Sequence, residues 1–286
     1  MNRIGIIISR EFKERVRKKS FIIMTILTPI IMIAIGAAPT LISDGNMELM
    51  SSDITTTISL VLGMTLYMLI IIYGQQVLAS VIEEKQSRVL DVMATSCKPF
   101  EMMMGKILGI AAVAAVQVAI WCALISFASQ FLMPINPISL PTTFGVFYML
   151  KLFTLLLLYI IGGFLLYASL FAAAGSAVDT NQDAQQFNTI IMLPIILGLI
   201  VMMSVFNDPN SSMALCFSII PFTSPIVMMA RIPFDIPFWQ IAVSLIALYA
   251  TFVLATWIAA RIYRIGIFMH GKKPSWKDLG AWLKAK

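Results

Sequence analysis

Long apolar stretches alternate with short polar ones along the chain. A bilayer core about 30 Å thick requires about 20 helical residues, and the apolar stretches reach roughly that length at 21–42, 58–82, 102–132, 145–177, 187–206 and 238–262. The segment between the last two of these stretches, 207–237, holds shorter apolar pieces broken by Pro221, Pro225 and Pro233. Such pieces are typical of re-entrant or interfacial segments. The pattern therefore predicts an all-α polytopic membrane protein with six transmembrane helices in a single transmembrane domain, residues 1–286.

Composition agrees with this pattern. The chain has 59% apolar and 12% charged residues, whereas a soluble domain has roughly 45–50% apolar and about 25% charged residues. The net charge is +6, and the basic residues concentrate at 1–19, 85–106 and 261–286. These runs flank apolar stretches, which indicates membrane topology rather than nucleic-acid binding. We expect a multi-pass protein of the cell (inner or plasma) membrane with both termini in the cytoplasm.

The N-terminal segment, residues 1–20, has the pattern of an amphipathic helix. Ile4, Ile7, Ile8 and Phe12 form an apolar stripe. The basic side carries Arg10, Lys13, Arg15, Arg17, Lys18 and Lys19. This pattern predicts an interfacial helix on the anionic cytoplasmic leaflet. A plain positively charged flank is the alternative, and it also lies in the cytoplasm.

The polar connector at 83–101 separates two strongly apolar stretches. Glu84 and Arg88 have the spacing of a helical ion pair. Pro99 either interrupts this helix or begins the next one, and Gly105 and Gly109 form a G-x-x-x-G pattern where the next apolar stretch starts. The connector is either a solvated loop or a rigid element that contacts another protein. Charges of both signs suit a protein partner better than anionic lipid.

Three sequence segments resemble one family. They are EEKQSR with KPF and GKILG between 83 and 109, the polar turn GSAVDTNQDAQQ at 175–186, and the basic tail that begins at ARIYRIG and includes residues 263–286. Together they resemble the membrane subunits of type-2 ABC exporters, most closely the sodium-extruding branch. The resemblance implies that the connector is a cytoplasmic coupling segment that docks on a separate ATPase subunit. It also implies a re-entrant helical pair at 207–237 in the outer leaflet, with Arg231 and Asp235 at the outer surface.

The resemblance further implies the residues and partners of the coupling site. The expected ATPase-coupling residues are Glu83, Glu84, Lys85, Arg88, Pro99 and Phe100 of the connector, with Arg10 and Glu11 of the N-terminal helix. The partner would be an ABC ATP-binding subunit that binds ATP and Mg²⁺, and this chain would hold no cofactor. The permease would form a homodimer, or a heterodimer with a similar permease, within the lipid bilayer.

One feature departs from the sodium-extruding branch. Its members usually carry a large extracytoplasmic domain between the first two spans. Here that place holds only residues 43–57, an acidic loop without lysine or arginine that we expect to face outside. We therefore do not assign sodium as the cargo.

Motifs of enzymes are missing from the sequence. It contains no G-x-x-x-x-G-K-[ST], no H-E-x-x-H, no C-x-x-C and only one histidine, His270. We therefore predict no catalytic and no metal site, and we expect the three cysteines to be buried apolar residues. For Gln75 and Gln76, near the cytoplasmic end of the second span, interhelical hydrogen bonding is favoured over substrate contact.

Two other classes of function remain open at this point. One is an ATP-independent channel or secondary carrier, and the other is a membrane scaffold subunit. Transport without nucleotide would indicate the first class, and recruitment of a partner without transport would indicate the second.

Overall fold

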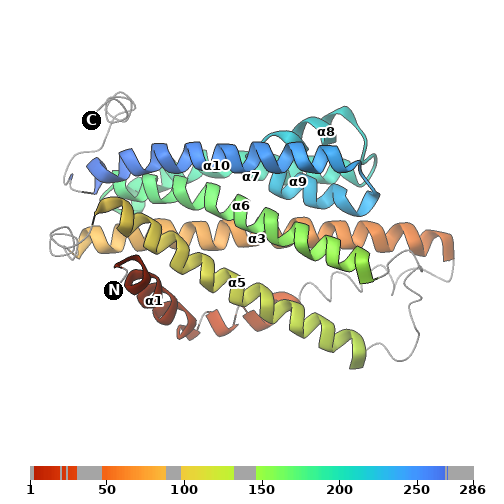
Figure 1. Ribbon diagram of the computed structural model, residues 1–286, viewed down its shortest axis with the longest axis horizontal. Coiled ribbons are helices and arrows are strands. Elements are labelled where there is room, and N and C mark those ends of the chain that lie inside the picture. The colour runs from red at the N-terminus through yellow and green to blue at the C-terminus, as the bar shows by residue number, and fades with distance from the viewer. Residues whose placement is uncertain are drawn as a thin grey trace.

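The computed structural model describes residues 3–19, 21–23, 25–30, 47–87, 98–131, 146–267 and 269. The main elements there are α1 (Arg3–Val16), α3 (Met47–Gln86), α5 (Pro99–Phe131), α6 (Val146–Ala177), α7 (Asn181–Val205), α8 (Ser212–Ile219), α9 (Ser224–Arg231), η1 (Ile232–Phe234) and α10 (Phe238–Gly266) (Figure 1). Within this part of the chain no strand occurs. The prediction of an all-α membrane protein is therefore confirmed.

Five of the described helices are long and apolar enough to cross a membrane. Their membrane-crossing parts are Thr55–Gln86, Pro99–Trp121, Leu150–Ala177, Gln182–Val205 and Phe238–Gly266. The first predicted span, at 21–42, is described only in part, as an apolar helix within Phe21–Ile30. Six spans therefore stay a prediction.

Two predicted loops are shorter in the structure. Helix α3 begins at Met47, so much of the expected outer loop at 43–57 is helical; no proline interrupts this helix up to Gln86. The expected polar turn at 175–186 shrinks to the three residues between α6 and α7. Thr180 explains the early start of α7, because its side chain accepts a hydrogen bond from the Asp183 backbone amide at 3.2 Å.

Pro99 begins a helix rather than interrupting one. It occupies the first position of α5. A backbone N–H at this position would make no hydrogen bond within the helix, so its absence in proline costs nothing. The side chain of Glu101 reaches back to accept from the backbone amide of Lys98 at 3.1 Å. The connector therefore ends in a defined helix start.

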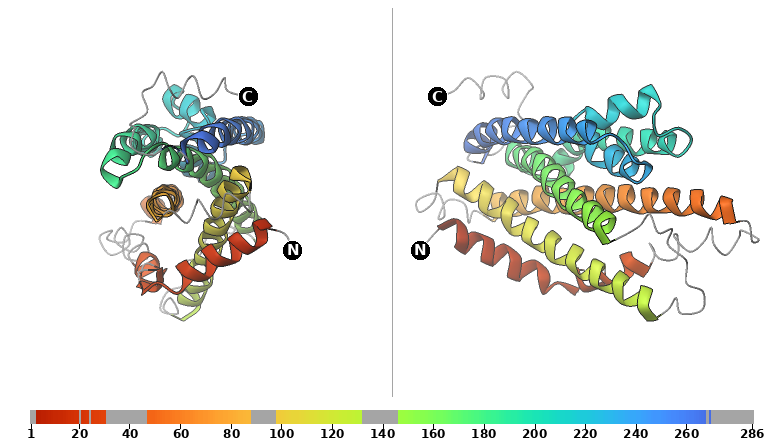
Figure 2. Two further views of the ribbon diagram at one scale, coloured as in Figure 1. Left: turned by 90° about the vertical axis from the view of Figure 1, so that its left-hand side faces the viewer. Right: turned by 45° about the vertical axis from the view of Figure 1, so that its right-hand side comes forward.

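The long helices run side by side along one axis, and α6 packs against both α3 and α10. In Figure 1, α1 lies at the end of the bundle where α3 finishes and α5 begins, and α8 and α9 lie toward the opposite end. The end-on view in Figure 2 places α1 on the far side of the bundle from α7 and α10. Helix α1 packs on α5.

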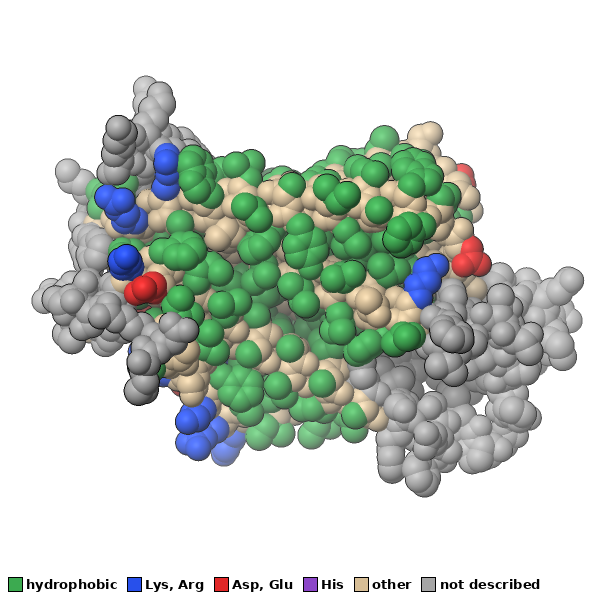
Figure 3. Space-filling model, in the orientation of Figure 1, with side chains coloured by type: hydrophobic (Ala, Val, Ile, Leu, Met, Phe, Trp, Pro, Cys, Tyr) green, Lys and Arg blue, Asp and Glu red, His purple; other side chains and the backbone are tan. Residues whose placement is uncertain are grey.

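The surface matches a membrane environment. Figure 3 shows hydrophobic side chains over the middle of this face and charged side chains near its two ends. Large apolar side chains such as Leu193, Ile200, Val253 and Trp257 are exposed. An apolar band of this kind is unfavourable in water and favourable in lipid.

In the region at 207–237, the expectations for Arg231 and for Cys216 were wrong. The two apolar pieces form the short helices α8 and α9, and α9 is buried along its whole length. Asp235 is exposed, as expected, but the Arg231 side chain is completely buried, because neighbouring oxygen atoms bind its guanidinium. Cys216 is exposed rather than buried, since it lies on the outer side of α8. Re-entrance into the membrane stays a prediction.

Candidate functional site

Helix α1 approaches α5 very closely at two glycines. A β-carbon placed on Gly105 would lie 2.8 Å from the Ile7 Cβ, and one on Gly109 would lie 2.7 Å from the Glu11 Cβ. Larger residues would therefore force the helices apart. Small residues four apart permit such close contact between membrane helices. The G-x-x-x-G pattern thus places Glu11 of α1 directly against the first turns of α5.

Lys106, between these glycines, is the centre of a buried group of charges. Its Nζ lies 3.0 Å from Glu84 Oε2 of α3 and 3.3 Å from Glu11 Oε1 of α1. It also donates to Ser80 Oγ at 2.6 Å. Only 2% of Lys106 is exposed. One ammonium group therefore joins three helices, and its charge is compensated by two carboxylates.

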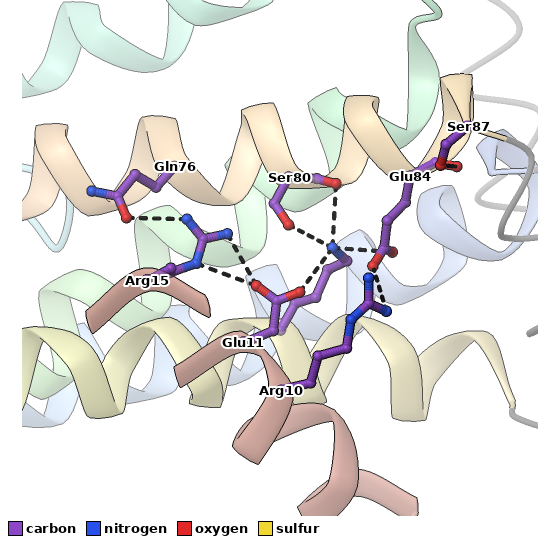
Figure 4. A network of polar contacts seen from close by, with 8 residues as sticks. Arg10, Glu11, Arg15, Gln76, Ser80, Glu84 and Ser87 are labelled. Atoms are coloured by element: carbon purple, nitrogen blue, oxygen red, sulfur yellow. Dashed lines mark hydrogen bonds and ion pairs between the residues drawn. The ribbon is translucent and has the colours of Figure 1, made fainter. Parts of the chain in front are cut away.

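Two arginines of α1 complete this group (Figure 4). Arg15 donates to Glu11 Oε2 at 3.0 and 3.2 Å and to Gln76 Oε1 at 3.1 Å, and Arg10 lies 3.6 Å from Glu84 Oε1. Burial raises the pKa of the Glu11 carboxyl, but the charges of Lys106 and Arg15 outweigh burial, so this pKa lies below its ordinary value. We call these residues the charge cluster: Arg10, Glu11, Arg15, Gln76, Ser80, Glu84 and Lys106.

Lys85, which follows Glu84 in α3, makes contacts on another side of the helix. The Lys85 Nζ lies 2.9 Å from Asp179 Oδ1 and donates to the Ser176 carbonyl at 2.8 Å, and Gln86 donates to the Asp179 carbonyl at 2.8 Å. Adjacent residues of a helix point about 100° apart. The end of α3 is therefore fixed to α1 and α5 through Glu84 and to the α6–α7 turn through Lys85.

Comparison with known proteins identifies the family of this bundle. The family model described as "ABC-2 family transporter protein" matches residues 42–261, more than three quarters of the chain. This chain belongs to the ABC-2 transporter family. The family consists of membrane permeases of ABC transporters, and the match does not distinguish the sodium-extruding branch.

Two similar proteins extend this result. The uncharacterized protein YhaP of Bacillus subtilis (strain 168) is 32% identical over 222 residues, which is 75% of this chain and 52% of that protein. The uncharacterized protein MJ1024 of Methanocaldococcus jannaschii is 29% identical over 206 residues, or 72% of this chain and 48% of that protein. The ABC-2 chain thus spans about half the length of these relatives.

The ABC-2 permease brings most of the expected coupling residues to one end of the bundle. Glu83, Phe100 and Arg10 are exposed there, and Pro99 is half-buried. Glu84, Lys85 and Glu11 are buried and hold helices together. Arg88, and with it the expected Glu84–Arg88 pair, lies outside the described residues. Their role in coupling stays a prediction.

Sequence reasoning missed Lys106, the central residue of the charge cluster in this permease. It lies inside the GKILG segment, which we used for the resemblance and for the G-x-x-x-G pattern but not for its lysine. A lysine on the buried face of an apolar helix needs a counter-charge, and Glu84 was already a candidate. The prediction for Gln75 and Gln76 is confirmed, because Gln75 donates to Met192 of α7 and Gln76 accepts from Arg15 of α1.

The opposite end of the permease also holds a buried cation. Arg231 of α9 donates to the Pro209 carbonyl at 2.7 Å, to Ser218 Oγ at 2.6 Å and to Gln240 Oε1 at 3.0 Å. We call these four residues the Arg231 site. All three acceptors are neutral, and among the described residues no carboxylate forms an ion pair with Arg231. Within the same part of the chain, no group of acidic, histidine and cysteine side chains could hold a metal ion.

Proposed function

We propose that this permease is the membrane-spanning subunit of an ATP-driven exporter. A separate ABC subunit would bind and hydrolyse ATP with Mg²⁺, and the cargo would leave between two permease chains. The two chains would be identical or similar. In this proposal the end of the bundle that carries α1 and the charge cluster faces the cytoplasm, and the chain lies in the inner or plasma membrane.

The observation that carries this proposal is the double attachment of the end of α3. Glu84 connects it to α1 and α5, and Lys85 connects it to the α6–α7 turn. A force applied next to these residues would reach both sides of the bundle through ion pairs whose members on α3, Glu84 and Lys85, are buried. The Glu84–Lys106 pair is buried and therefore little weakened by water and salt. An ordinary solvated loop would need no such attachment.

The exposed residues at the same end are suited to contact the ATPase. Glu83 on α3 and Phe100 on α5 lie near the two ends of the connector, and Phe100 is 49% exposed although it is aromatic. Exposed aromatic residues often anchor protein–protein contacts. We infer that Glu83, Phe100 and Arg10 contact the ATPase, and that Glu84, Lys85 and Glu11 transmit its motion. Closure of the ATPase pair would then move α3 and open the permease outward.

Gentle-detergent purification of the full chain from its native membrane tests this proposal. We expect a stoichiometric partner with a P-loop, identified by mass spectrometry. Glu83→Arg and Phe100→Asp should each reduce recovery of this partner about tenfold, which corresponds to losing one strong interface contact. Asp208→Arg is the matched control, because Asp208 is exposed on the loop that follows α7.

A chain that is recovered alone, even after crosslinking, would contradict the ATP-driven exporter. An ATP-independent carrier or a scaffold subunit would then explain the family membership better. If the partner is recovered but none of the coupling-end variants weakens it, the partner binds elsewhere and the assignment of the docking residues is wrong.

A further inference from the structure

A hollow adjoins the charge cluster on the side toward the middle of the bundle. It has a volume of about 310 Å³ and is lined by Arg15, Lys18, Phe21, Ile72, Gln76 and Gln117, together with Tyr73. We call it the donor pocket. It lies between the end of α1, the start of the following apolar helix, α3 and α5. The exporter proposed above assigns no role to it.

The polar groups around the donor pocket have unused hydrogen-bond donors. The Gln76 side-chain oxygen accepts from Arg15, and the Gln117 oxygen accepts from the Tyr73 hydroxyl. This arrangement leaves both amide nitrogens as donors. Gln117 is only 3% exposed, and its side-chain oxygen is the atom that accepts from Tyr73. Because these contacts do not use the amide nitrogens of Gln76 and Gln117, the pocket is suited to a ligand that accepts hydrogen bonds.

The charge of the donor pocket is positive. Arg15 and Lys18 line it, and no carboxylate does. The neighbouring hollow of about 270 Å³ between α1 and α3 differs, because Glu11, Glu14, Glu83 and Glu84 line it. The two hollows share Arg15, Lys18 and Gln76, but only the neighbouring one is lined by carboxylates. An anion is therefore favoured more in the donor pocket than in the neighbouring hollow.

The donor pocket combines basic and apolar side chains. Gln76 lies one helical turn, about 6 Å, further into the bundle than Ser80 of the charge cluster. Phe21 and Ile72 give the pocket apolar walls, and Lys18 and its neighbours Arg17 and Lys19 are exposed beside it. Basic side chains next to apolar surface are typical of sites that bind the phosphate of an amphiphile.

We propose that the donor pocket binds the phosphate group of an anionic phosphoester, with the ammonium of Lys18 and the amide nitrogens of Gln76 and Gln117 as donors. The pocket volume admits a phosphate with its glycerol, and the apolar walls face the attached chains. Arg15 contributes positive charge while it holds Gln76. A bound phosphate would connect α1 to α3 and α5 in addition to the charge cluster.

Equilibrium binding to the purified full chain in detergent tests this site, with short-chain phosphatidylglycerol as the probe and phosphatidylcholine as the zwitterionic reference. We expect phosphatidylglycerol to bind at least about tenfold more tightly. Lys18→Gln should weaken its binding about tenfold, since one charge-assisted hydrogen bond is lost. Gln76→Glu should weaken it similarly, because it keeps an acceptor for Arg15 but replaces the donor with a negative oxygen.

Lys19→Gln and Lys13→Gln are the matched controls, because they remove the same charge from exposed positions that do not line the pocket. They should leave binding within about twofold. Equal losses in Lys18→Gln and Lys19→Gln, or equal affinity for both lipids, would overturn the proposal. Competition by glycerol 3-phosphate distinguishes the source: full displacement indicates a soluble phosphate ester, and no displacement indicates a membrane lipid. None of these measurements depends on ATP, so they test the site separately from the exporter.

Discussion

The two ends of the bundle stabilise a buried cation in different ways. Lys106 lies among carboxylates from two other helices, α1 and α3. Arg231 lies among three neutral oxygens, from Pro209, Ser218 and Gln240. The first arrangement balances charge with charge, whereas the second balances charge with dipoles alone. The cost of removing each cation should differ accordingly.

The two sites also differ in the length of chain that they join. The partners of Arg231 are 9 to 22 residues away in sequence, so the Arg231 site holds together one local region around α8 and α9. Lys106 contacts Glu11, which is 95 residues away. The charge cluster therefore fixes the position of a whole separate helix, α1. A site such as the charge cluster can transmit movement between helices, whereas the Arg231 site keeps one local region rigid.

Lys106→Met should have the largest effect on stability. It leaves the buried Glu11 and Glu84 without their shared counter-charge, and breaking a buried ion pair in this way costs about 3–5 kcal/mol. The free energy of unfolding in mixed micelles measures this cost. The double variant Lys106→Met, Glu84→Gln should recover part of the loss, because one orphaned charge is removed. Equal stability of the single and double variants would show that the carboxylates are not orphaned.

Arg231→Met should lower the free energy of unfolding less than Lys106→Met does, by about 1–3 kcal/mol. The change leaves three oxygens without a donor, but it also removes a buried charge that no carboxylate among the described residues compensates. The same unfolding measurement compares it directly with Lys106→Met. An equal or larger loss for Arg231→Met would refute the contrast between the two ends. Limited proteolysis should show new cleavage confined to the region around α8 and α9.

Gly109→Ala should have a smaller effect, roughly 1–2 kcal/mol, because its methyl group would meet the Glu11 Cβ and the Ile8 carbonyl. The control is Gly198→Ala, where the nearest atom to a new Cβ is 3.6 Å away; alanine should be neutral or stabilising there. Crosslinking between cysteines introduced in α1 and α5 should weaken in Gly109→Ala only. Unchanged crosslinking would mean that α1 does not depend on this close contact.

Much of the fold followed from hydrophobic pattern alone, and the reasons for the misses are physical. Apolar length located α5, α6 and α10 closely, because lipid requires continuous helices. The start of α3 at Met47 was missed because serine, threonine and aspartate favour loops only weakly and no proline stops the helix. The early start of α7 depends on a single cap, Thr180, within a segment that is polar throughout.

The candidate site was predictable only in part. Glu84, Lys85 and Glu11 were chosen from resemblance, and all three are buried and make ion pairs. The sequence did not indicate which helices they join, because that depends on how the helices pack. Arg231 was placed at the outer surface from the resemblance, which does not indicate the oxygens around it. Those oxygens include the Pro209 carbonyl, and a backbone atom leaves no signal in side-chain pattern.

The smallest expected effect concerns pH and distinguishes the two ends once more. Because the pKa of Glu11 is lower in the folded protein than its ordinary value of 4.5, the charge cluster contributes its full stability above that value. The contribution is lost as the pH falls toward the folded pKa. Thermal unfolding between about pH 6 and about pH 3 should therefore show a falling melting temperature. Glu11→Gln should flatten this slope, and Arg231→Met should leave it unchanged because no carboxylate takes part in the Arg231 site. If the slope of Glu11→Gln equals that of the unmodified protein, the acid sensitivity arises from other carboxyl groups.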